Sequence, residues 1–357
     1  METPAPSPAF IFGSGAAVDG GRPVPAATWL RSAPFDLTLI IGVAALALLS
    51  GALVTARPNL FLTVLFLDIW LLGQVHVIST FLRLASASDR PLHRNFLAIG
   101  LLVIVGGATA FCASLGPWLL RTLYFYWQWF HYTRQSYGIA RLFAQTAPGR
   151  DRLTDRWSFW TLHLVSLWGI LHRSHQQPGQ FLGSSAWYLP VPEPALRFVA
   201  ALSVLSLAGW ATRQIVAIRR GRWHAPLALY LASHLLIVSV AYLLTDNVTH
   251  GWLIINIWHN AQYILLVWWV NNRCFQDRWD HAHRWLSVLS QRRHVLGYVA
   301  ACLGLSAAAY AVLGHALTVL RIPTFTLIVS QTINFHHYLI DGMIWRTRRR
   351  TATPQPC

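Results

Sequence analysis

Ten long apolar segments run through this chain. A helix needs about 20 mostly apolar residues to cross a bilayer, and the segments approach or exceed that length: residues 36–56, 60–83, 96–115, 118–142, 157–171, 195–217, 226–244, 250–271, 295–320 and 323–345. Only 11% of the residues are charged, whereas a soluble domain has about 25%. The sequence therefore predicts an all-α fold, a polytopic transmembrane helical bundle of about ten spans.

The arginines alternate between the two ends of the predicted spans. They cluster before the first span and after spans two, four, six, eight and ten, and the other connections hold only Arg57, Arg121, Arg173, Arg197 and Arg321. Cytoplasmic loops carry the excess of positive charge, so we expect an even number of spans, both termini in the cytoplasm and a location in the inner membrane. The net charge of +16 then follows from topology and gives no reason to expect a nucleic acid partner.

The segments form one predicted domain. Residues 36–346 are expected to be a single transmembrane helical domain surrounded by membrane lipid. Residues 1–35 are rich in Pro, Ala and Gly and lack the pattern of a signal peptide, which favours a flexible cytoplasmic tail. Residues 347–357 are expected to form a basic C-terminal tail.

Histidines lie at a common depth in four of the predicted spans. His76, His131, His259 and the pair His336 and His337 are all in even-numbered spans, between 7 and 14 residues before the first arginine beyond the span. With a rise of 1.5 Å per residue, these positions fall within a layer about 10 Å thick. Imidazoles from several helices at one depth are typical of a metal or haem site in a bundle core.

Polar neighbours allow more than one interpretation of these histidines. A histidine in a membrane also forms hydrogen bonds between helices, so each residue alone has a structural alternative. Asp341 lies four residues after His337, on the same helix face, and can orient that ring. Pairing of Asp341 with Arg346 or Arg134 is the alternative.

The four histidine motifs, in their order, resemble the Brp/Blh family of bacterial and archaeal membrane β-carotene dioxygenases. That family has a histidine in an early span, then an "HFG" type motif, then "H-x-x-x-H-F-x-x-x-W" and finally "H-x-x-x-x-D-x-x-F-R". The matching positions here are His76, His131 within "FHYTRQSYG", His259 within "WHNAQYILLVW", and His336 to Asp341 followed by Trp345 and Arg346. The resemblance extends from about residue 60 to 346.

The chain also departs from the family pattern. Tyr263 replaces the second histidine of the third motif, and His337 is an additional histidine that can replace the missing ligand. The resemblance favours His336 over His337 as the ligand of the pair. It implies non-haem Fe(II) as the cofactor, O₂ as a co-substrate and a lipophilic, carotenoid- or lipid-like substrate from the bilayer. Tyr263 and Asp341 are the candidate catalytic residues.

Two other functions agree with the same residues. One is a haem-binding membrane protein for electron transfer, with pairs of histidines as axial ligands. The other is a transporter or assembly factor in which the histidines relay protons. The sequence leaves both open beside the oxygenase.

Overall fold

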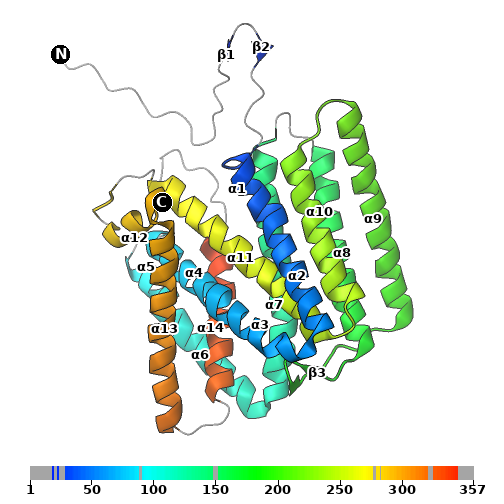
Figure 1. Cartoon of the computed structure of the whole chain (residues 1–357). Helices are drawn as coiled ribbons and strands as arrows, with labels where there is room; N and C mark the ends of the chain where they lie inside the picture. The colour runs from blue at the N-terminus through cyan, green and yellow to red at the C-terminus, as the bar shows by residue number, and fades with distance from the viewer. Residues whose placement is uncertain are drawn as a thin grey trace, which may run out of the picture.

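The computed structural model describes residues 18–19, 22–23, 29–87, 91–147, 152–275, 279–281, 283–320 and 325–344. Within these ranges the chain is almost entirely helical, which confirms the all-α prediction. Long helices pack side by side into a bundle (Figure 1). The predicted tails, 1–35 and 347–357, lie mostly or wholly outside the described residues.

Among the described residues, four long helices contain a π-helical segment, in which hydrogen bonds reach one residue further along the chain. They are α1, η1 and α2 (Ala33–Leu37, Thr38–Gly42, Val43–Ala56); α3, η3 and α4 (Phe61–Leu67, Asp68–Gly73, Gln74–Ala87); α5, η4 and α6 (Pro91–Asn95, Phe96–Gly100, Leu101–Leu115); and α10 with η5 (Ala225–Ser239, Val240–Leu244).

The remaining long helices have no such interruption. They are α7 (Pro117–Gln145), α8 (Arg152–Gln176), α9 (Glu193–Arg219), α11 (Val248–Phe275), α13 (Val295–Leu320) and α14 (Phe325–Ile344). Short turns are η2 (Pro58–Leu60), α12 (Arg284–Leu289) and η6 (Arg292–His294). The strands are two antiparallel pairs, β1 (Val18–Asp19) with β2 (Arg22–Pro23) and β3 (Gln180–Phe181) with β4 (Ser184–Ser185).

Six helices in the described ranges are long and apolar enough to cross a membrane, so the chain has the character of a multi-pass membrane protein. They are Ala33–Ala56, Pro58–Leu84, Leu92–Leu115, Glu193–Arg219, Ala225–Leu244 and Val248–Phe275. The other four predicted spans coincide with α7, α8, α13 and α14. Ten crossings therefore stay a prediction, and α8 is longer than the segment 157–171 expected for it.

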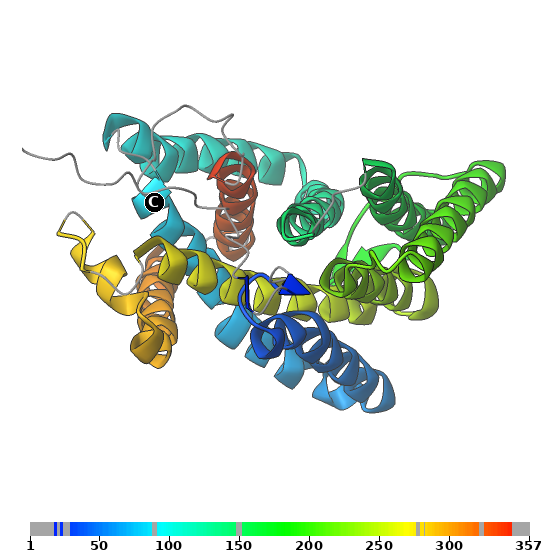
Figure 2. The ribbon, with the colours of Figure 1, turned by 90° about the horizontal axis from the view of Figure 1, so that it is seen from above.

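Helix α11 lies in the interior of the bundle. Of the residues in its most apolar stretch of 18, 83% are buried. The helix contacts α2, α4 and η5. Viewed from above, α11 crosses the middle of the molecule, with α9 and α13 on opposite sides (Figure 2). Two glycines permit this close packing. A Cβ atom on Gly251 would lie 2.0 Å from the Ala241 carbonyl oxygen, and one on Gly51 would lie 2.3 Å from Ile254.

The β3 and β4 hairpin closes one end of the bundle, called the hairpin end below (bottom of Figure 1). Its Phe181 is fully buried against the rings of Phe125 and Trp252. Beside it Arg173, also fully buried, donates hydrogen bonds to the carbonyl oxygens of Ala241 and Asp246. The end of the α10 and η5 helix is thereby capped by a guanidinium group, which satisfies carbonyls that a helix end leaves free.

Candidate metal centre

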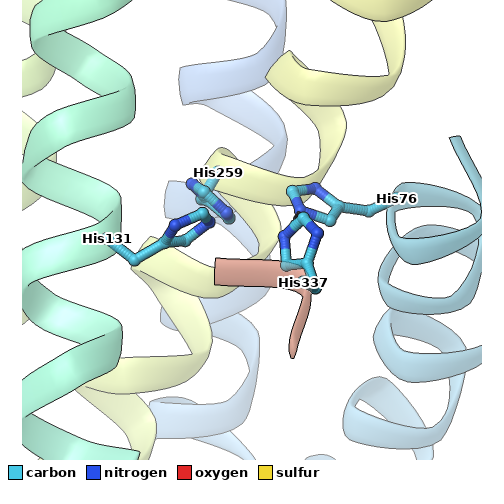
Figure 3. A group of neighbouring side chains, drawn as sticks. All are labelled: His76, His131, His259 and His337. Atoms are coloured by element: carbon cyan, nitrogen blue, oxygen red, sulfur yellow. Dashed lines mark hydrogen bonds between the residues drawn. The ribbon is translucent and has the colours of Figure 1, made fainter. Parts of the chain in front are cut away.

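Four histidines from four helices meet in the interior of the bundle (Figure 3). His76 comes from α4, His131 from α7, His259 from α11 and His337 from α14. One ring nitrogen from each lies within 4.8 Å of the others, and none of these side chains is more than 7% exposed. The structure thus brings together four of the five histidines that the sequence singled out.

The nitrogen atoms inside the cluster have few partners other than one another. The Nε2 atoms of His76 and His337 are 2.6 Å apart, which is within hydrogen-bond distance. The Nε2 atom of His131 is buried and has no hydrogen-bond partner among the described residues. A buried polar atom without a partner is costly, and a bound cation would satisfy it. Neutral imidazoles bind iron, copper and zinc, so the group can hold a metal ion.

His336 lies outside this cluster, which corrects the preference for it over His337. Its Nε2 donates to the Leu97 carbonyl oxygen at 2.8 Å, and its ring stacks on Phe81 with centroids 5.4 Å apart. Leu97 belongs to the π-helical η4, where the wider turn leaves a carbonyl open to a side-chain donor. Neighbouring residues point about 100° apart around a helix. When His337 faces the cluster, His336 therefore points away from it, toward Leu97 of η4 and Phe81 of α4.

Thr80 connects His337 to a tyrosine and a carboxylate. Its hydroxyl oxygen lies 2.8 Å from His337 Nδ1 and 2.8 Å from the Tyr263 hydroxyl. Because His337 Nε2 faces the other histidines, the network assigns the ring proton to Nδ1, which donates to Thr80. Thr80 then donates to Tyr263, and Tyr263 donates to Asp341 Oδ1 at 2.5 Å. This chain of donors fixes the tautomer of His337, as is usual for a metal-binding histidine.

Asp341 has one oxygen toward this chain and the other toward the cluster. Its Oδ2 is 3.9 Å from His131 Nε2 and 3.8 Å from His337 Nε2. Asp341 therefore orients the His337 ring, as predicted, mainly through the hydrogen bonds of Tyr263 and Thr80. Arg346, one predicted alternative partner of Asp341, lies outside the described residues, and the guanidinium of Arg134 lies over the Phe130 ring.

Tyr263 lies beside the four histidines and supports them. Its fully buried ring packs against His76, with centroids 4.1 Å apart, and its hydroxyl is bound to Asp341 and Thr80. His337 supplies the fourth imidazole of the group, and Tyr263 is not one of its nitrogen donors. The structure thus gives the two residues different places: His337 within the cluster and Tyr263 next to it.

Three residues near the histidines were not among the sequence candidates. Thr80 is one; its position four residues after His76, on the same helix face, was the available signal. The others are Tyr132, whose ring lies 4.1 Å from that of His259, and Tyr338, whose ring stacks on His131 at 4.3 Å. A tyrosine ring therefore packs closely on each of three imidazoles, those of His76, His131 and His259.

Comparison with protein families, curated proteins and solved structures finds no match to this chain. The geometry of the four histidines and their neighbours is the basis for a functional conclusion.

Proposed function

We propose that this protein is a membrane-embedded non-haem iron oxygenase that acts on a hydrophobic, carotenoid- or lipid-like substrate. The observation that carries the proposal is the buried group of His76, His131, His259 and His337. Its inner-membrane location, with ten spans and both termini in the cytoplasm, is part of the proposal and is supported by the arginine distribution.

The donor set supports iron more than it supports a structural metal. Structural zinc sites are usually closed tetrahedra that include cysteine, whereas histidines with a nearby carboxylate are common in Fe(II) oxygenases. The resemblance of the four motifs to the Brp/Blh family supports the same metal. When bound, Fe(II) would supply the redox chemistry that joins O₂ to an organic substrate.

The protein's own groups have separable tasks in this proposal. The four imidazoles hold the metal, and the chain from His337 through Thr80 to Tyr263 and Asp341 fixes one of them. Asp341 Oδ2, close to two ligand nitrogens, is placed to accept a proton at the centre. The surrounding apolar helices exclude water from reactive species, and a lipophilic substrate would enter from the bilayer.

The haem alternative fits the geometry less well. The ring centroids of His76 and His337 are 4.4 Å apart, those of His131 and His259 are 4.9 Å apart, and those of His131 and His337 are 5.0 Å apart. Rings in such mutual contact leave no plane for a flat macrocycle between them. An absorption spectrum of the purified protein tests this directly, because a strong Soret band would establish haem and reject the non-haem proposal.

The proton-relay alternative has one observation in its favour, the short contact between His76 and His337. Elemental analysis of the purified protein separates it from the metal site. We expect close to one iron per chain in the wild type. His131→Ala and His259→Ala should contain at least tenfold less iron, because even the loss of an outer partner of a metal ligand lowers the metal affinity about 10–100-fold. His175→Ala, at an exposed position near the hairpin end, is the control. Iron absent from the wild type, or retained by both ligand variants, would reject the proposal.

Activity is tested separately from metal content. Cells that accumulate β-carotene or other carotenoids should lose colour when they express the wild-type protein, with uptake of O₂ by isolated membranes. His259→Ala should show neither effect. A protein that binds iron but consumes no O₂ with any carotenoid or unsaturated lipid would leave a metal site without the proposed oxygenase activity.

A further inference from the structure

A buried carboxylate lies near the histidine cluster, away from Asp341. Asp68 in η3 is 3% exposed, and its two oxygens accept hydrogen bonds from side-chain amides of α11. Asn256 Nδ2 donates to Oδ2, and Asn260 Nδ2 donates to Oδ1 at 3.3 Å. An acidic side chain at membrane depth is expensive and rarely without a task, and nothing in the proposed chemistry above uses this one.

The π-helical segment η3 turns Asp68 and His76 toward the same neighbour. Eight residues of regular α-helix would leave two side chains about 80° apart around the axis. A π turn contains one additional residue. Eight residues that include such a turn therefore advance around the helix axis about as far as seven residues of regular α-helix, which is within about 20° of two full turns. Asp68 and His76 therefore lie on one face of their helix, and this face packs against α11.

On α11 the two amides lie on either side of His259. Asn256 precedes His259 by three residues and Asn260 follows it directly, so one carboxylate that binds both amides fixes the rotation of α11. Asn256 Oδ1 in turn accepts from the Tyr132 hydroxyl and from Gln128 Nε2, and the Tyr132 ring packs on His259. His259 is thus held by its own helix and by a tyrosine that depends on the same asparagine.

We propose that Asp68 is a positioning residue of the metal site, which sets the placement of His259 relative to His76 through Asn256, Asn260 and Tyr132. The inference rests on the proposed metal-binding function. One carboxylate, two amides and a phenol thus set how the ligands are placed without being ligands themselves.

The test uses Co(II) bound to the purified full-length protein, because the visible d–d absorption bands respond to ligand geometry. Asp68→Asn replaces one acceptor oxygen by a donor, so it opposes one of the two amides. We expect shifted Co(II) bands and a Co(II) affinity about 10–100-fold lower, the usual loss when an outer partner of a metal ligand is removed.

An exchange of the two side chains is the matched rescue. In the double variant Asp68→Asn with Asn256→Asp, the amide at 68 donates to the carboxylate at 256 and still accepts from Asn260. The carboxylate at 256 accepts from Tyr132 and Gln128 as the amide oxygen did. The exchange should restore the Co(II) bands and most of the affinity, which a general loss of stability would not do.

Tyr132→Phe gives a second reading if Asp68→Asn fails to fold. This variant keeps the ring on His259 but removes the hydrogen bond to Asn256. It should shift the Co(II) bands in the same direction as Asp68→Asn, by a smaller amount. Unchanged bands in Asp68→Asn or, if that variant cannot be obtained, in Tyr132→Phe would overturn the inference; so would bands that the exchange does not restore. Failure of the wild type to bind Co(II) or iron would instead reject the metal site itself, and with it this role of Asp68.

Discussion

Adjacent histidines in α14 have different surroundings because they point about 100° apart around the helix. His337 meets three other imidazoles, whereas His336 meets a backbone carbonyl and a phenyl ring. Chemically identical side chains one residue apart are therefore expected to differ in function. The pair provides a comparison in which helix, depth and residue type are all matched.

We expect His337→Ala to lose most of the bound metal and His336→Ala to retain it. His336→Ala should instead destabilise the fold by about 1–3 kcal/mol, because it leaves the buried Leu97 carbonyl without its donor. Metal content and thermal unfolding of both variants are the measurements. Loss of metal from His336→Ala alone would show that the ligand assignment is reversed.

Thr80 is expected to matter for metal affinity although it is not a ligand. Thr80→Val keeps the shape of the side chain but removes the hydroxyl that accepts from His337 Nδ1. The affinity should fall about 10–100-fold, as measured by competition with a chelator of known affinity. Thr80→Ser keeps the hydroxyl and should stay close to the wild type, so equal losses in both variants would point to packing instead.

At the scale of helices, close approach around α11 brings the ligands within reach of one another. Gly251→Ala places a methyl group against the Ala241 carbonyl of η5, so it should destabilise the protein by about 1–3 kcal/mol or more. Gly107→Ala in α6 is the control, because its Cβ would meet no atom within 4 Å. That change should be neutral or stabilising by about 0.5–1 kcal/mol. Thermal unfolding in one detergent compares the two, and equal effects would argue against tight packing at Gly251.

The helices and the depth of the histidines could be predicted from the sequence, but their rotation could not. Apolar length and arginine placement locate a helix along the membrane normal, which is why His76, His131 and His259 were singled out together. Rotation depends on packing and on π turns such as Asp68–Gly73, which have no simple sequence signal. The choice of His337 over His336 and the role of Thr80 both depend on that rotation.

For the whole molecule, the positive charges predict a definite orientation. A fluorescent protein fused after residue 357 should fluoresce, since it folds in the cytoplasm, and alkaline phosphatase inserted in the loop 177–192 should be active, since it requires the outer side. The same two reporters exchanged between these sites should be inactive. A phosphatase that is active at the C-terminus would contradict an even number of spans with both termini inside.

The metal is also expected to stabilise the whole bundle, because its ligands join helices that are distant in the chain. His76 and His337 alone are separated by 261 residues, and α7 and α11 supply the other two imidazoles. A ligand that binds only the folded state at 100 times its dissociation constant adds about 2.7 kcal/mol to the free energy of unfolding. Chelation should therefore lower the melting temperature of the wild type, and added Fe(II) under anaerobic conditions should restore it. His259→Ala should melt at one temperature whether or not metal is present, and a metal-dependent shift in that variant would place the stabilising ion elsewhere.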